Sequence, residues 1–258
     1  MPEPDTGAAA PMPSRLSAIL KRRKRPDIIA DKVRDMIIAH RLVPGDRVPH
    51  EWLLPQTHGA SRGTLREAQK ILEIQGLTTS KTGPGGGVFV SRVGADQAIR
   101  LLDNLFVFQP PSIADIYAIR KELEPLMAAS LAGKLSPDAF AALQETIRLY
   151  EDEAKTVEEE YAQRLAELDF HVELARRADN VLLGFVCIFL VSLLRDMTTC
   201  RAIYQEANPT LRETGLNYQI RLLRAIKAGD AERAFQVMRE HMTAAEAYML
   251  ERAEIVRG

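Results

Sequence analysis

The sequence predicts a mainly α-helical protein in two parts: a small N-terminal part with helices and one β-hairpin, then an all-α antiparallel helical bundle. Three observations lead to this prediction. Between residues 27 and 92, helix-period patterns precede a glycine-rich hairpin pattern. After residue 96 the helix period continues, and turn signals separate long segments. Charge divides at the same place, because residues 14–92 carry 15 basic and 7 acidic side chains, whereas residues 93–258 carry 19 and 26.

Length and composition exclude several classes of protein. Of the 258 residues, 46% are hydrophobic and 27% are charged, which is typical of a globular chain. The longest apolar run, Val181–Leu194, is shorter than the roughly 20 residues of a membrane span. No secretory signal pattern is visible at the N-terminus, and Cys187 and Cys200 give no disulfide framework. We therefore expect a cytoplasmic protein with no membrane partner.

The N-terminal part reads as a winged helix-turn-helix. Residues 1–25 are rich in proline and alanine and then basic, and we expect a disordered arm there. Pro55 removes an N–H from a short helical segment, so we expect that segment to be irregular or shortened. The predicted elements are a helix at 27–40, a helical segment at 49–58, a helix at 62–75 with Ser61 as its N-cap, and strands at 77–81 and 88–91.

The second part, residues 93–258, reads as helix throughout. Short loops between long helices make neighbouring helices antiparallel. The predicted helices span 96–107, 113–133, 137–155, 158–178, 180–206, 210–228 and 230–253, with Asn180 as a cap. The domain prediction is therefore an arm at 1–25, a winged helix-turn-helix part at 26–92 and a helical part at 93–258.

The helix that follows Ser61 is the candidate DNA-binding element. Its apolar stripe is Leu65, Ala68 and Leu72, and its basic stripe is Arg62, Arg66 and Lys70. A basic face of this kind can lie in a major groove, where arginine reads guanine through two hydrogen bonds. Thr64 is short enough to meet a base edge or a phosphate, and Gly63 lets the backbone approach. The alternative interpretation is a solvated helix face.

Three motifs in order resemble the GntR family of winged helix-turn-helix regulators. They are PGDRVP at 44–49, ASRGTLREAQKILEIQGL at 60–77 and KTGPGGGVFV at 81–90. The resemblance implies that Ser61, Arg62, Thr64 and Arg66, with Gly83 and its neighbours on the wing, contact DNA. Trp52 departs from the pattern, because many relatives carry a DNA-contacting arginine at this position.

The second part resembles the FCD ligand-binding domain, which defines the FadR-type branch of that family. The resemblance rests on R-x-x-LE at 120–124, a Glu-to-Ala block at 167–175 and a closing segment at 225–241. Many FCD domains hold a divalent metal such as zinc with one aspartate and three histidines. The resemblance places these ligands at Glu167, His171, Gln219 and His241. Glutamine is a poorer ligand than histidine, so the occupancy of the metal site stays open.

Arg120 is the candidate partner for a ligand carboxylate, because its guanidinium can donate two parallel hydrogen bonds. Its alternative role is an ion pair with Glu124, one turn along the same helix. The functional prediction is a ligand-responsive, homodimeric transcription factor, a repressor, that binds a palindromic operator in double-stranded DNA and senses a small organic acid. Two alternatives stay open, a metal-dependent hydrolase and a constitutive DNA-binding protein without an effector.

Overall fold

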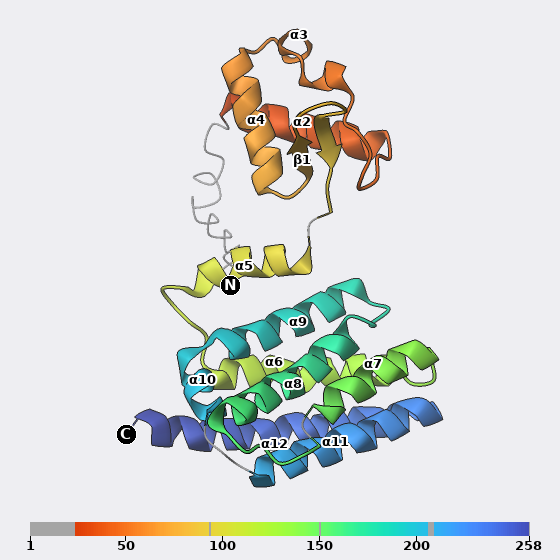
Figure 1. The fold of residues 1–258 in the computed structure, drawn as a ribbon, viewed down its shortest axis with the longest axis vertical. Helices are drawn as coiled ribbons and strands as arrows, with labels where there is room; N and C mark the ends of the chain where they lie inside the picture. The colour runs from red at the N-terminus through yellow and green to blue at the C-terminus, as the bar shows by residue number, and fades with distance from the viewer. Residues whose placement is uncertain (1–23, 93, 150, 206–208, 258) are drawn as a thin grey trace, which may run out of the picture. The chain divides into compact units, whose positions relative to one another are not determined.

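The computed structural model describes residues 24–92, 94–149, 151–205 and 209–257 (Figure 1). The chain forms two compact units, residues 1–98 and 99–258, and each is described by itself. The mainly α-helical fold with a single two-stranded hairpin is confirmed. The predicted arm at 1–25 lies outside the described residues, apart from Lys24 and Arg25.

The first unit has the element order of a winged helix-turn-helix. Its elements are α2 (Arg25–Ala39), the 3-10 helix η1 (His50–Leu53), α3 (Pro55–His58), α4 (Arg62–Ile74), β1 (Thr78–Lys81) and β2 (Gly87–Val90). The segment predicted at 49–58 is divided between η1 and α3. Pro55 is the first residue of α3, a position where its missing N–H breaks no helical hydrogen bond. The expectation of a shortened, irregular helix is therefore confirmed.

A third extended segment, which the sequence analysis did not predict, pairs with the hairpin. β1 and β2 pair antiparallel, with Thr78 opposite Val90 and Lys81 opposite Gly87. Residues 45–48, which lie outside the predicted strands, also pair with β2 on its other side. The Val48 N–H donates to the Val88 carbonyl at 2.8 Å, and the Val90 N–H donates to the Asp46 carbonyl at 2.8 Å. This third segment fixes the wing to the body of the unit.

The core of the first unit follows the predicted apolar stripes, with two exceptions. Its buried members are Ile29, Ala30, Val33, Ile37, Val48, Trp52, Leu65, Ala68, Leu72 and Val90. Ile28 and Ile38 belong to the apolar pattern of α2, but they are 42% and 66% exposed. Adjacent helical residues point about 100° apart, so Ile28 cannot share a narrow stripe with Ile29. Trp52 is buried and its ring lies 4.7 Å from that of His40, so it is a core residue.

The second unit is a helical bundle centred on α6 (Figure 1). Helix α5 (Ala95–Phe106) spans the boundary between the units. The helices that follow it are α6 (Ile113–Ser130), α7 (Pro137–Arg148), α8 (Val157–Ala175), α9 (Val181–Asp196), α10 (Thr198–Tyr204), α11 (Pro209–Ala228) and α12 (Ala231–Arg257). α6 packs against α8, α9, α11 and α12, and α8 runs beside both α7 and α9. Asn180 caps α9 as predicted, because its side-chain oxygen accepts hydrogen bonds from the Leu182 and Leu183 N–H groups.

Most predicted helices differ from the structure by up to four residues at an end, and two differ more. The helix predicted at 137–155 ends at Arg148. The helix predicted at 180–206 breaks at Met197, whose ψ of 127° is extended, so α9 and α10 meet at a bend of 75°. In the described residues, no single helix is long and apolar enough to cross a membrane, although this bent pair would pass on length and composition alone.

Candidate functional site

α4 presents its basic stripe to solvent. Arg62, Arg66 and Lys70 are exposed, whereas Leu65 and Leu72 on the opposite face are buried. The stripe is spaced by four residues, so the three cations lie one above the other along α4. This arrangement suits a helix that lies along the phosphates and base edges of a major groove.

Ser61 and Thr64 form the N-cap of α4. The Thr64 N–H donates to the Ser61 side-chain oxygen at 3.1 Å, and the two hydroxyls are 2.9 Å apart. Both hydroxyls therefore stabilise the start of the helix and stand beside Arg62. Gly63 has room for a side chain, because an added Cβ would meet only the Ser61 oxygen, at 3.6 Å. The fold itself does not require glycine at this position.

The wing tip is held by an arginine that the sequence analysis did not single out. Gly83 has a φ of +90°, which favours glycine, and its carbonyl accepts the Gly86 N–H at 2.8 Å. The Arg47 guanidinium donates to the Gly86 carbonyl at 2.6 Å. The wing is therefore a defined loop that can approach a phosphate or a minor groove.

The second unit contains a small cavity of about 40 Å³, lined by both polar and apolar side chains. Its walls come from α6, α8, α10 and α12. The lining residues are Tyr117, Arg120, Arg164, Glu167, Leu168, His171, Tyr204, His241, Met242, Ala245, Tyr248 and Met249. The structure thus places Arg120, Glu167, His171 and His241 of the predicted site at one cavity. Gln219 is buried on α11, with its amide nitrogen 3.5 Å from the backbone oxygen of Glu167.

A chain of buried polar groups crosses one wall of the cavity. Arg120 Nε donates to Glu124 Oε1 at 2.5 Å, and His171 Nδ1 lies 2.6 Å from Glu124 Oε2. His171 Nε2 lies 3.2 Å from His241 Nε2. Nδ1 of His171 faces Glu124 and its Nε2 faces His241, and the tautomers of the two rings set which nitrogen donates. Each group in this chain therefore positions the next.

The electrostatics of the chain favour a charged Arg120–Glu124 pair and a neutral His241. Burial alone would raise the pKa of the Glu124 carboxyl, but the Arg120 guanidinium and His171 outweigh it and hold that pKa well below its usual range. Burial, together with His171 and Arg120, lowers the pKa of His241 well below its usual value. Burial also raises the pKa of the Tyr117 and Tyr204 hydroxyls, so both are neutral hydrogen-bonding groups.

Arg120 retains unused hydrogen-bonding capacity. Its side chain is 1% exposed, and Nη2 has no hydrogen-bond partner among the described residues. The guanidinium carbon lies 5.0 Å from the centre of the Tyr117 ring. An unsatisfied buried donor costs about 1–3 kcal/mol, more when it is charged, so an anion or a water at Nη2 would lower the free energy. Both roles weighed for Arg120 are therefore compatible, because Nε pairs with Glu124 while Nη2 is available.

The four predicted metal ligands do not come together as a set. His171 and His241 meet, but the Glu167 carboxylate pairs with Arg164 Nη1 at 3.0 Å. No group of three or more His, Cys, Asp or Glu side chains suited to a metal occurs among the described residues. The buried Arg120 guanidinium beside the histidines also repels a cation. The residues present therefore do not fit a bound divalent metal.

The sequence analysis missed the central role of Glu124. The carboxylate against His171 comes from Glu124 on α6, not from Glu167 on α8. Tyr117 and Tyr204, which also line the cavity, were not singled out. The R-x-x-LE motif contained the signal, because arginine and glutamate one turn apart share a helix face. Which other helix meets that face cannot be read from spacing within α6.

Comparison with known proteins identifies both units. Residues 27–90 match the family described as bacterial regulatory proteins, gntR family, and residues 115–244 match the FCD domain. The chain is 27% identical to the putative L-lactate dehydrogenase operon regulatory protein of Escherichia coli over 230 residues, covering 87% of this chain and 86% of that protein. It is 23% identical to the transcriptional repressor NanR of Salmonella schwarzengrund, covering 88% and 85%.

A solved structure supports the fold as well. The GntR protein of Streptococcus agalactiae aligns with a TM-score of 0.60 at 18% identity, covering 86% of this chain and 99% of that one. The matches are to transcriptional regulators, so the two alternative functions, a hydrolase and a DNA-binding protein without an effector, are not supported.

Proposed function

Because the chain belongs to the GntR family and contains an FCD domain, it is a DNA-binding transcriptional regulator, and we propose that it senses a small organic acid in the α6–α12 bundle. The observation that carries this proposal is the buried, unpartnered Nη2 of Arg120 at the cavity. A carboxylate placed there forms a charge-assisted hydrogen bond. A neutral acceptor would form a weaker hydrogen bond there, and a cationic ligand would be repelled by the guanidinium.

The rest of the cavity wall suits a small, hydroxylated acid. The Tyr117 and Tyr204 hydroxyls and His241 can hydrogen-bond to a hydroxyl or carbonyl next to the carboxylate. The cavity of about 40 Å³ holds little more than water, so an acid of three or more carbons requires it to widen. Met242 and Met249 line it, and flexible methionine side chains can move aside at low cost. No metal is needed in this mode of binding.

The test is a binding measurement with L-lactate, chosen because one relative is named for an L-lactate dehydrogenase operon. Lactamide, which lacks the carboxylate charge, is the matched control ligand. We expect L-lactate or another acid of three to six carbons to bind and raise the melting temperature, and the corresponding amide to have no effect. Arg120→Lys keeps a charged partner for Glu124 but loses the forked donor, so we expect it to weaken acid binding at least tenfold in a folded protein.

Two results would contradict the proposal. One is acid binding by Arg120→Lys with wild-type affinity. The other is a protein that binds no acid from a panel of three to six carbons at millimolar concentration.

We further propose that the protein represses transcription as a homodimer bound to a palindromic operator. One recognition helix reads only a few base pairs, and a two-fold dimer places two α4 helices in successive major grooves. Repression follows the relative that is named as a repressor. The cavity residues bind rather than transform a ligand, so no catalytic role is assigned to them.

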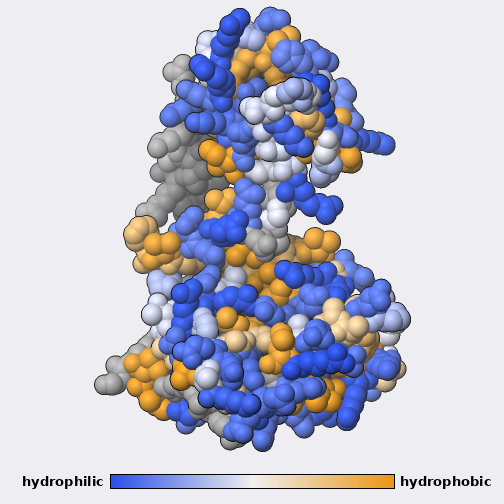
Figure 2. Space-filling view, in the orientation of Figure 1, coloured by the Kyte–Doolittle hydropathy of each residue, from blue (hydrophilic) through white to orange (hydrophobic). Residues whose placement is uncertain are grey.

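Exposed apolar side chains on the bundle support self-association. In the orientation of Figure 2, hydrophobic residues gather along α9. Val181 and Leu182 at the start of α9 are 82% and 70% exposed, and Ile119 and Leu126 on α6 are 48% and 53% exposed. Large apolar side chains that are exposed in this way are candidates for an interaction surface. We expect Leu182→Glu with Ile119→Glu to shift the full-length protein from dimer to monomer in sedimentation velocity; an unchanged dimer would move the interface to another face.

A further inference from the structure

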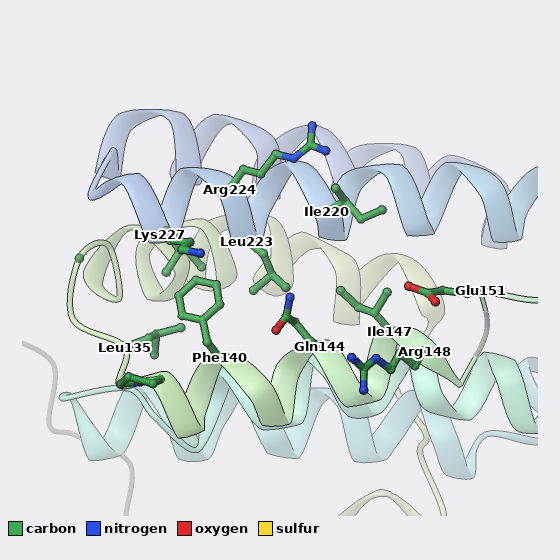
Figure 3. A pocket seen from close by; sticks show the side chains of 13 residues that line it. Leu135, Phe140, Gln144, Ile147, Arg148, Glu151, Ile220, Leu223, Arg224 and Lys227 are labelled. Carbon is green, nitrogen blue, oxygen red and sulfur yellow. The ribbon is translucent and has the colours of Figure 1, made fainter.

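A second, larger cavity lies in the bundle between α7 and α11 (Figure 3). Its volume is about 930 Å³, which is within the range of small-molecule sites. Among the described residues, no side chain lines both this cavity and the one at Arg120. We call this second cavity the α7–α11 groove. It has no part in the proposed effector site.

The floor of the groove is apolar. Phe140 and Ile147 point up from α7, and Leu223 points down from α11 towards them (Figure 3). Ile147 and Leu223 are buried, whereas Phe140 and Ile220 are half-buried and still offer surface to a ligand. An apolar body laid along this floor would be removed from water on one side.

The rim of the groove is cationic. Arg148, Arg224 and Lys227 line it, against the carboxylate of Glu151. Arg224 and Lys227 are exposed, and neither has a carboxylate within salt-bridge distance in the described parts of the chain. They are one turn apart on α11. In Figure 3 the Arg224 side chain points away from α7, so it meets an anionic group beside Lys227 only after a change of rotamer, which its exposure allows. This excess of positive charge occurs in a part of the chain, residues 93–258, with 19 basic and 26 acidic side chains.

We propose that the α7–α11 groove binds an amphipathic carboxylate, a molecule with an unbranched apolar body and one anionic head group. The body lies along Phe140, Ile147 and Ile220, and the head group lies between Arg224 and Lys227. Lys227 Nζ is 6.0 Å from the centre of the Phe140 ring, so the head group and the apolar floor adjoin. The proposal is independent of DNA binding and of acid binding at Arg120.

The experiment measures binding of octanoate and of octan-1-ol to the full-length protein by calorimetry, below the micelle concentration. Octan-1-ol keeps the apolar body and removes the charge. We expect octanoate to bind at least tenfold more tightly than octan-1-ol. In the Arg224→Gln, Lys227→Gln double variant, octanoate affinity should fall to that of octan-1-ol, whose own affinity should not change. Arg239→Gln, on the exposed face of α12, is the matched control and should bind both as wild type does.

A blocking variant separates the groove from other sites. The Gln144 side chain points from α7 into the groove, so Gln144→Trp should obstruct the apolar floor and weaken binding of both ligands (Figure 3). Three results would overturn the proposal: no octanoate binding to wild type at millimolar concentration, octanoate binding that Arg120→Lys abolishes and the double variant retains, or a double variant that dissociates a wild-type dimer in sedimentation velocity. The last result would mean that a second copy of the chain covers the groove.

Discussion

Arg120 and Glu124 have opposite charges, and both side chains are at most 1% exposed. Removing one partner from such a pair leaves the other charge buried. We therefore expect Arg120→Ala to reduce the free energy of unfolding by about 3–5 kcal/mol. Replacing both residues with methionine should cost clearly less, because no uncompensated charge remains. Urea unfolding followed by far-UV circular dichroism checks this, and equal losses in the single and double variants would mean that the pair is not coupled.

His241 predicts a pH dependence of bundle stability. Its pKa is lowered in the folded state, so the unfolded chain takes up a proton first as the pH falls below about 6.5. Folding stability is thus present above that pH and falls below it, by at most about 1.4 kcal/mol per pH unit. The Glu124 carboxyl, whose pKa is also lowered, changes the folding stability only below its usual pKa of about 4.5. Between pH 7.5 and 5.5 the loss of folding stability should therefore come from His241 and not from Glu124.

The readout can separate the two units. Trp52, the single tryptophan, lies in the core of the first unit, so its fluorescence reports that unit, while circular dichroism at 222 nm reports mainly the bundle. We expect His241→Gln to flatten the pH slope of the circular dichroism transition and to leave the tryptophan transition unchanged. If the pH slope of the circular dichroism transition persists in His241→Gln, another titrating group causes it.

At the scale of elements, α4 allows the fold and DNA contact to be tested separately. Gly63 lies inside α4, and alanine fits there without a clash. Gly63→Ala should therefore stabilise the helix by up to about 1 kcal/mol, while its methyl group keeps the helix backbone from approaching DNA closely. We expect raised thermal stability with weakened operator binding, measured on DNA selected from a random pool by the full-length protein. If Gly63→Ala binds DNA with wild-type affinity, Gly63 does not lie at the DNA interface.

The basic side chains of α4 provide the companion test. Arg62→Ala and Arg66→Ala should each weaken operator binding without loss of stability, because both side chains are exposed. The logarithm of the affinity should fall linearly with the logarithm of the salt concentration, and each variant should lower the slope by about one unit if its arginine contacts a phosphate. Glu67→Gln, on an exposed part of the same helix, is the control. If the Arg62→Ala, Arg66→Ala double variant binds the operator with wild-type affinity, the basic stripe is a solvated surface and not a DNA contact.

Elements were predicted best where local chemistry determines them. Ser61 and Asn180 cap α4 and α9 through hydrogen bonds to nearby N–H groups, and the Leu65, Ala68 and Leu72 stripe is buried as its spacing indicates. The pairing of residues 45–48 with β2 and the break at Met197 were missed. Both depend on what the rest of the fold packs against them, and no short pattern reports that. The contact between Glu124 and His171, 47 residues apart, was missed for the same reason.

At the scale of the whole molecule, the last prediction joins the acid site to DNA binding. If an acid at Arg120 favours one dimer geometry, it changes operator affinity by a coupling of roughly 1–3 kcal/mol, which is about 5- to 150-fold. Linkage then requires operator DNA to change the acid's affinity by the same factor. Both factors can be measured with L-lactate, or with whichever acid of the panel binds, and with the selected operator. Unequal factors would mean that the acid acts at a second site or on the assembly state.

Two variants make this linkage test specific. Arg120→Lys should remove the acid's effect while acid-free operator binding stays at the wild-type level, because Arg120 belongs to the second unit and α4 to the first. Arg66→Ala should do the reverse, since it weakens operator binding but leaves acid affinity of the free protein unchanged. If Arg120→Lys binds the acid with wild-type affinity and its operator binding still responds to the acid, Arg120 is only the structural partner of Glu124. The effector would then have to bind without this guanidinium.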